Sequence, residues 1–71
     1  MIKVALIGLG RIGQMHAENL INHTEFNLKY IFDIDKKLSK KLSKKYQSTS
    51  IESPSVAFKD KSIKSIFIST S

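Results

Sequence analysis

Apolar and polar residues follow one another along the chain in blocks that predict strands and helices in alternation. Residues 2–7, Ile-Lys-Val-Ala-Leu-Ile, form a nearly continuous apolar run. Such a run is typical of a strand buried on both faces, as in a parallel sheet that helices cover. A second run covers Phe26 to Asp33, a short strand is predicted near Thr49 to Glu52, and a final strand is predicted from Ser65 to Thr70.

The interval between the first two strands has helical periodicity. Its apolar residues recur near helical spacing and predict a helix over about Arg11 to Asn22. These residues are Ile12, Met15, Ala17, Leu20 and Ile21.

Two further helices are predicted by an apolar stripe and by capping residues. Leu38, Leu42 and Tyr46 recur at i, i+4 and i+8, so we expect a helix over residues 36–46 with Asp35 as its N-cap. Ser53 followed by Pro54 is a good helix start, since serine caps well and proline suits the first helical position. A short helix over about residues 54–58 is therefore expected.

This alternation predicts an α/β fold with a Rossmann-type parallel sheet and crossover helices. Right-handed crossovers favour the strand order 3-2-1-4, with a switch point between the first and fourth strands. Ligands of such sheets bind outside the carboxyl ends of the strands at that point. Ser69, Thr70 and Ser71 lie at this edge and are candidates to contact a nicotinamide-side ribose or a pyrophosphate, although polar residues often end strands without any ligand.

Three glycines at the spacing Gly8-x-Gly10-x-x-Gly13 separate the first strand from the first helix. Gly8 would allow the tight turn, Gly10 the close approach of a pyrophosphate, and Gly13 the packing of helix against strand. The free N–H groups of the first helical turn and the helix dipole favour phosphate there, and Arg11 could add a charge-assisted bond. A glycine-rich turn without a ligand is the alternative that the bare motif leaves open.

An acidic residue at the expected distance strengthens the dinucleotide interpretation. Asp33 ends the second strand, twenty residues after Gly13, and should lie beside the glycine turn. Its carboxylate could accept hydrogen bonds from both hydroxyls of the adenosine ribose and would repel a 2′-phosphate. The sequence therefore predicts NAD rather than NADP as the cofactor.

The residues in and around these motifs resemble the N-terminal sequence of the Gfo/Idh/MocA family of sugar and polyol dehydrogenases. Inositol 2-dehydrogenase is the best-known type in that family. The matching segments are Gly8-Leu9-Gly10-Arg11-Ile12-Gly13 followed by His16 and Asn19, then Asp33-Ile34-Asp35, and finally Ile68-Ser69-Thr70-Ser71. The predicted cofactor-binding residues are Gly8, Gly10, Arg11, Ile12, Gly13, Asp33, Ser69 and Thr70.

The resemblance implies an NAD-dependent dehydrogenase that transfers a hydride between a sugar or polyol hydroxyl, inositol-like in type, and the nicotinamide. Residues 1–71 would be the N-terminal portion of its Rossmann domain. The family's catalytic lysine, in a Glu-Lys-Pro motif, is expected about twenty-five residues past Ser71, with the catalytic Asp and His and the substrate domain also downstream. No catalytic residue is assigned within the chain. A non-catalytic NAD-binding redox sensor and a basic binding domain are the alternatives.

The net charge of +6 invites a nucleic-acid interpretation, which the distribution of charge argues against. Six lysines, at positions 36, 37, 40, 41, 44 and 45, occupy the polar faces of one predicted helix. We interpret them as its solvated outer surface, since no nucleic-acid-binding motif accompanies them.

Composition and length narrow the remaining classes. The chain has no cysteine, and its histidines are not spaced as a metal-ligand pair, so a cytoplasmic protein without a metal site is expected. No apolar stretch approaches the roughly 20 residues of a membrane span, so no membrane partner is expected. At 71 residues we expect a fragment of marginal stability. Its last apolar strand would pair with downstream sequence or with another copy, so a homo-oligomer is expected.

Overall fold

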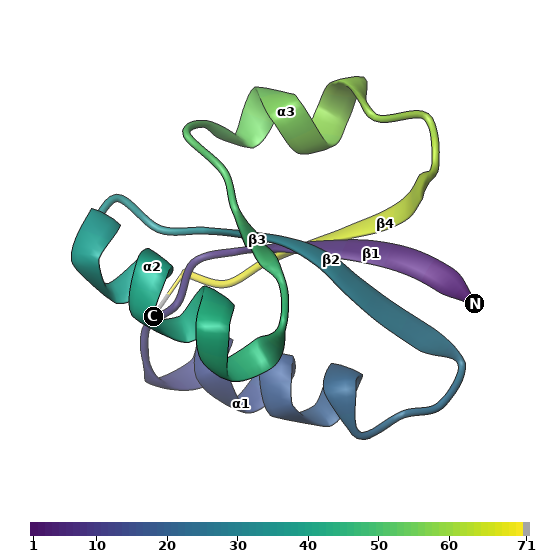
Figure 1. Ribbon diagram of the computed structural model, residues 1–71, viewed down its shortest axis with the longest axis horizontal. Helices are drawn as coiled ribbons and strands as arrows, with labels where there is room; N and C mark the ends of the chain where they lie inside the picture. Colours follow the sequence, from purple (N-terminus) through teal and green to yellow (C-terminus); the bar gives the residue numbers. More distant parts are fainter. Residues whose placement is uncertain (71) are drawn as a thin grey trace.

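The computed structural model describes residues 1–70, in which strands and helices alternate along the chain (Figure 1). The elements are β1 (Ile2–Ile7), α1 (Arg11–Ile21), β2 (Phe26–Phe32), α2 (Lys36–Tyr46), β3 (Thr49–Ser50), α3 (Pro54–Lys59) and β4 (Ile63–Ile68).

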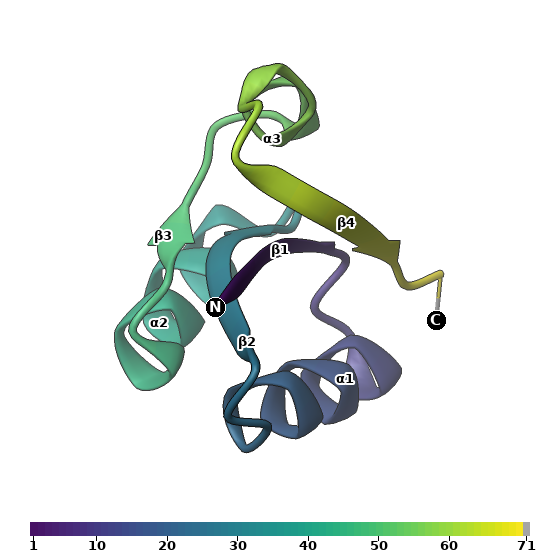
Figure 2. The same cartoon turned by 90° about the vertical axis from the view of Figure 1, so that its right-hand side faces the viewer.

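The four strands form one parallel sheet in the order β3-β2-β1-β4. Helices α1 and α2 lie on one face of the sheet and α3 lies on the other (Figures 1 and 2). The predicted Rossmann-type α/β fold and its strand order are thereby confirmed. Strands β1, β2 and β4 end at the same edge, which brings residues 8, 33 and 69 to the switch point.

Each face of the sheet has its own apolar core. The core on the α1–α2 face is the larger one. It contains Val4, Leu6, Leu9, Ala17, Leu20, Leu28, Ile31, Leu42 and Tyr46. The core on the α3 face contains Ala5, Ile51 and Ala57, with Tyr30, Phe32, Ile63 and Ile66 packed against it. The predicted stripe of α2 is confirmed, since Leu42 and Tyr46 are buried and Leu38 packs against them.

The buried stripe of α1 differs from the predicted one. Gly13, Ala17 and Leu20 face the sheet, whereas Ile12 and Met15 are 46% and 57% exposed. The shift follows from the contact of Gly13 with the end of β1, because a helix that packs on a glycine turns the neighbouring side chains outward.

Two register shifts interrupt the sheet on either side of β1. Val4 pairs with Leu28 and the next residue, Ala5, pairs with Tyr30, so Lys29 is an extra residue in β2. On the other side Lys3 pairs with Ile63 and Val4 with Ser65, so that residue 64 is extra in β4. Because side chains alternate between faces, each extra residue changes which face the following side chains occupy.

The helix caps are those that the sequence predicted. The Asp35 carboxylate accepts from the Leu38 N–H at 3.1 Å, and the Ser53 hydroxyl accepts from the Ser55 N–H at 3.2 Å. Helix α2 ends at Gln47, which adopts a left-handed conformation with φ of 56°. The observed bounds otherwise agree with prediction at most ends and differ by one or two residues at the carboxyl ends of α1, β2, β3 and α3, as helix and strand ends commonly do.

Strand β4 starts and ends two residues earlier than predicted because a turn at Asp60 fixes its beginning. The Asp60 carboxylate accepts hydrogen bonds from the Ser62 N–H and hydroxyl at 2.8 and 2.6 Å. Its other oxygen lies 2.6 Å from both the Lys29 ammonium and the Tyr30 hydroxyl. The Lys29 ammonium, then the Ser62 and Tyr30 hydroxyls, hold the pKa of Asp60 well below its ordinary value, and the same contact raises the pKa of Lys29.

Candidate functional site

The turn between β1 and α1 depends on Gly8. This residue has a φ of +102°, which disfavours any other residue. A Cβ atom there would lie 2.2 Å from the Ser69 carbonyl oxygen, so the chain after β4 passes directly against the turn. The Gly8 N–H donates to the Phe32 carbonyl at 2.8 Å, which joins the turn to the end of β2 as well.

Gly13 allows the first turn of α1 to pack directly against Gly8 in the glycine turn. A Cβ atom at Gly13 would lie 2.0 Å from the Gly8 carbonyl oxygen, a distance that no real side chain tolerates. Gly10 is the N-cap of α1, with no side-chain cap bond. The first N–H groups of a helix lack intrahelical partners, so α1 presents amide donors beside the turn. These features fit a bound phosphate group, which would accept from the amides at the positive end of the helix.

Leu9 is the residue that holds the turn in shape. Its N–H donates to Oδ2 of Asp33 at 2.7 Å, and its carbonyl accepts from the Gln14 side-chain amide at 2.9 Å. Its side chain is fully buried in the larger core. Sequence analysis missed both Leu9 and Gln14, because the glycine motif treats these positions as variable. An apolar residue between two glycines was the one sign in the sequence that Leu9 would be buried.

Asp33 lies beside the glycine turn, as the sequence predicted, and both of its oxygens are engaged. Oδ2 accepts from the Leu9 N–H and Oδ1 accepts from the Asp35 N–H at 2.9 Å. Each carboxylate oxygen can accept more than one hydrogen bond, so ribose hydroxyls can still donate to it. The carboxylate thus fixes the glycine turn and the start of α2 at once.

The end of β4 completes the site. The Ser69 N–H donates to the Ile7 carbonyl at 2.8 Å, and its hydroxyl oxygen is buried with no hydrogen-bond partner among residues 1–70. A buried hydroxyl without a partner is uncommon, which suggests that a water or ligand supplies one. Arg11, Ile12 and Thr70 are exposed at the same edge, and residue 71 lies outside the described residues.

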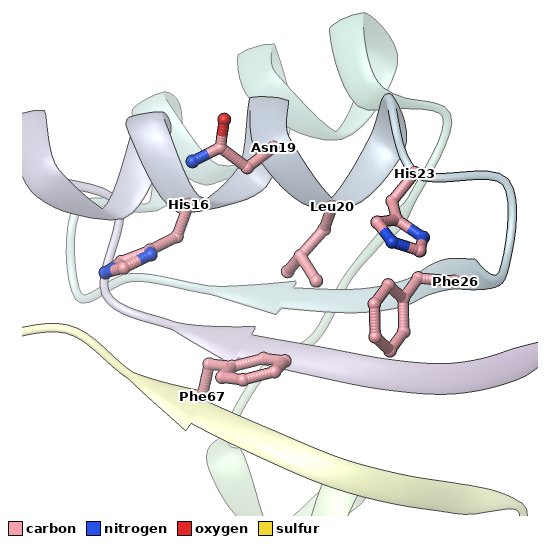
Figure 3. A pocket seen from close by; sticks show the side chains of 6 residues that line it. All are labelled: His16, Asn19, Leu20, His23, Phe26 and Phe67. Atoms are coloured by element: carbon pink, nitrogen blue, oxygen red, sulfur yellow. The ribbon is translucent and has the colours of Figure 1, made fainter.

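A separate groove runs between α1 and β4. Its volume is about 170 Å³, and it is lined by His16, Asn19, Leu20, His23, Phe26 and Phe67 (Figure 3). The His23 and Phe26 rings pack together at one end, with centroids 4.9 Å apart. None of the predicted cofactor residues lines this groove, whereas His16 does.

Within residues 1–70, no group of His, Cys, Asp and Glu side chains is arranged to hold a metal ion. Over the same residues, every helix is too short or too polar to cross a bilayer. The six lysines of residues 36–45 are exposed, as expected for an outer helix face.

Comparison with known families decides the classification of this site. The profile of the Gfo/Idh/MocA family, described as an oxidoreductase family with an NAD-binding Rossmann fold, matches residues 2–71. The chain belongs to the Gfo/Idh/MocA family. It is accordingly an NAD-binding domain of an oxidoreductase family. No match was found among curated proteins.

Solved structures of dehydrogenases share the fold. Myo-inositol dehydrogenase from Corynebacterium glutamicum is 28% identical with a TM-score of 0.89, and the match covers 100% of this chain and 21% of that chain. A probable dehydrogenase from Thermotoga maritima is 27% identical, with a TM-score of 0.89 and 99% and 21% coverage. Myo-inositol dehydrogenase from Lactobacillus casei, solved with NAD(H) and myo-inositol, is 22% identical, with a TM-score of 0.88 and 99% and 22% coverage. The chain thus spans about a fifth of the length of these structures.

Proposed function

We propose that this chain is the N-terminal part of the cofactor domain of an NAD-dependent dehydrogenase that acts on a hydroxyl of a sugar or polyol, of inositol type. The observation that carries the proposal is the contact between Leu9 and Asp33. It places a carboxylate 2.7 Å from the backbone of the glycine turn, where a dinucleotide would present its ribose beside its pyrophosphate.

The residues divide into three groups by the part of the cofactor they would meet. Gly10 would leave room for the pyrophosphate, while Gly8 and Gly13 allow the tight turn and the close helix packing beside it. The first amides of α1, at Arg11 and Ile12, would donate to the pyrophosphate. Asp33 would accept from the ribose hydroxyls at the adenosine end. Ser69 and Thr70 would face the nicotinamide-side ribose or the pyrophosphate.

Bound NAD would supply the hydride acceptor of the reaction. The residues described here would bind and orient the cofactor, and none of them is proposed to move a proton of the substrate. We place the acid/base lysine in a Glu-Lys-Pro motif beyond residue 71, as the resemblance to the family implies. A cytoplasmic location, expected from the cysteine-free sequence, is part of the same proposal.

The substrate class draws support from the relatives. Two of the similar solved structures are myo-inositol dehydrogenases, one of them 28% identical to this chain.

Titration of NAD into the protein by calorimetry tests the cofactor site. Gly10→Val should abolish measurable binding, because a branched side chain at the N-cap of α1 would occupy the space of the pyrophosphate. Circular dichroism should show a folded variant, because valine at an N-cap costs only about 1 kcal/mol. Unchanged NAD affinity in the folded variant would refute the phosphate cradle.

The dehydrogenase activity itself is tested with the full-length protein. We expect NADH to form when NAD is supplied with myo-inositol or a related polyol, and substitution of the proposed lysine to abolish the reaction. NAD binding without any hydride transfer to or from a panel of sugars and polyols would favour a redox sensor instead.

A further inference from the structure

A second carboxylate, Glu52, lies at the ribose end of the proposed cofactor site. With Asp33 it lines a hollow of about 20 Å³ at the carboxyl ends of β2 and β3. Two lysines of α2, Lys36 and Lys40, line the same hollow. Two acidic and two basic residues therefore line the hollow, and their formal charges cancel.

Lys36 occupies a position that helix electrostatics disfavours. It is the first residue of α2, and the first turn of that helix has no acidic side chain. A cation at the positive end of a helix dipole is destabilising. The Lys36 ammonium lies 3.4 Å from Oε2 of Glu52, which offsets the unfavourable charge.

The balance of charge at this place matters for the choice of cofactor. NADP differs from NAD by a phosphate on the 2′ position of the adenosine ribose. Asp33 is proposed to bind the hydroxyls of that ribose. A hollow of about 20 Å³ holds no more than about one water molecule, so a 2′-phosphate would lie at its rim. The side chains of Lys36 and Glu52, which are 75% and 81% exposed, are available at that rim.

We propose that Glu52 is a specificity-determining residue that acts through Lys36. By pairing with the Lys36 ammonium at 3.4 Å, Glu52 withholds that positive charge from a 2′-phosphate. The inference rests on the proposed function, since it places the adenosine ribose at Asp33. The proposed function assigns the choice between NAD and NADP to Asp33 alone. This inference assigns part of that choice to Glu52, which follows β3, and to Lys36 of α2.

The test is calorimetric titration of NAD and NADP into the wild type and Glu52→Gln. We expect the variant to bind NADP about two- to fivefold more tightly, the range that exposed charge pairs give, with little change for NAD. The gain should shrink at high ionic strength. It should disappear in Glu52→Gln/Lys36→Gln, because the released ammonium is then absent.

Glu18→Gln is the matched control, because Glu18 also pairs with an exposed lysine, Lys45, at 3.6 Å, but lines no part of the hollow. An equal rise in NADP affinity in Glu18→Gln would overturn the proposal, as would no rise in Glu52→Gln or a rise that survives in the double variant. A wild type that binds neither nucleotide would instead overturn the proposed function and, with it, this inference.

Discussion

The Leu9 N–H donates to Oδ2 of Asp33 at 2.7 Å, across 24 residues of sequence. Through this contact the carboxylate at the end of β2 holds the middle of the glycine turn, while its other oxygen holds the Asp35 N–H. The proposed ribose-binding group is thus also a structural part of the glycine turn, the proposed site of the pyrophosphate. Substitutions at Asp33 must be interpreted with both roles in mind.

Asp33→Ser should reduce the preference for NAD over NADP by about ten- to a hundredfold, since hydrogen bonds to charged groups contribute about 1.5–3 kcal/mol. The shorter, neutral side chain would lose the ribose acceptor and the repulsion of a 2′-phosphate. Calorimetry with both nucleotides measures the ratio, and Glu18→Gln controls for the loss of one negative charge. A wild type that prefers NADP, or an unchanged ratio in the variant, would contradict the assignment.

Gly13→Ala should destabilise the fold by about 1–3 kcal/mol, the usual cost of overpacking. The added methyl group would meet the Gly8 carbonyl at 2.0 Å, so α1 would have to move away from β1. Urea unfolding of the protein measures the loss. Met15→Ala, on the exposed side of the same helix, should change stability by no more than about 0.5 kcal/mol. Equal effects of the two substitutions would contradict the close contact.

Ser69→Ala should weaken cofactor binding without lowering the stability of the protein. In the part of the chain that the structure describes, the Ser69 hydroxyl is buried without a partner, so its removal should leave stability without NAD unchanged or slightly higher. NAD affinity should fall about two- to tenfold if the cofactor or a bridging water completes that hydrogen bond. Thermal unfolding and calorimetry give the two readouts, with Ser43→Ala on α2 as the control. An NAD affinity equal to that of wild type would show that the hydroxyl takes no part.

Asp60→Asn should make the protein less stable at neutral pH and should remove part of its sensitivity to acid. The pKa of Asp60 is lowered in the folded state, chiefly by Lys29, so its contribution is fully present above its ordinary pKa of 3.8. That contribution is lost as the pH falls toward the lower folded value. The difference in unfolding free energy between wild type and variant should therefore close below about pH 4. A difference that is constant between pH 7 and pH 3 would contradict the interpretation.

Much of the fold could be predicted from the sequence because its local signals agree with one another. Apolar runs, a period-four stripe in α2 and the caps Asp35 and Ser53 each identify one element. Right-handed crossovers then leave one strand order, which the structure confirms. The proximity of Asp33 to the glycine turn followed from that order alone, since parallel strands end at one edge.

The parts that could not be predicted depend on contacts between distant residues. The role of Leu9 needs the position of Asp33, and the outward turn of Ile12 needs the contact of Gly13 with Gly8. The extra residues at Lys29 and Lys64 were not predicted either, because both strands contain enough apolar residues to fit either register. Pairing with β1 decides which residue is extra, and the sequence of one strand does not contain that information.

Both register shifts fall in the amino-terminal half of the sheet, one between Val4 and Ala5 and the other between Lys3 and Val4. From Ala5 to Ile7 the central strand pairs without interruption on both sides, up to the residues that carry the glycine turn, Asp33 and Ser69. The two halves of the sheet should therefore differ in their tolerance of evolutionary insertion and deletion. One added or lost residue near Lys29 or Lys64 can be absorbed by a bulge, whereas the same change after Ala5 would displace the proposed cofactor-binding residues from one another.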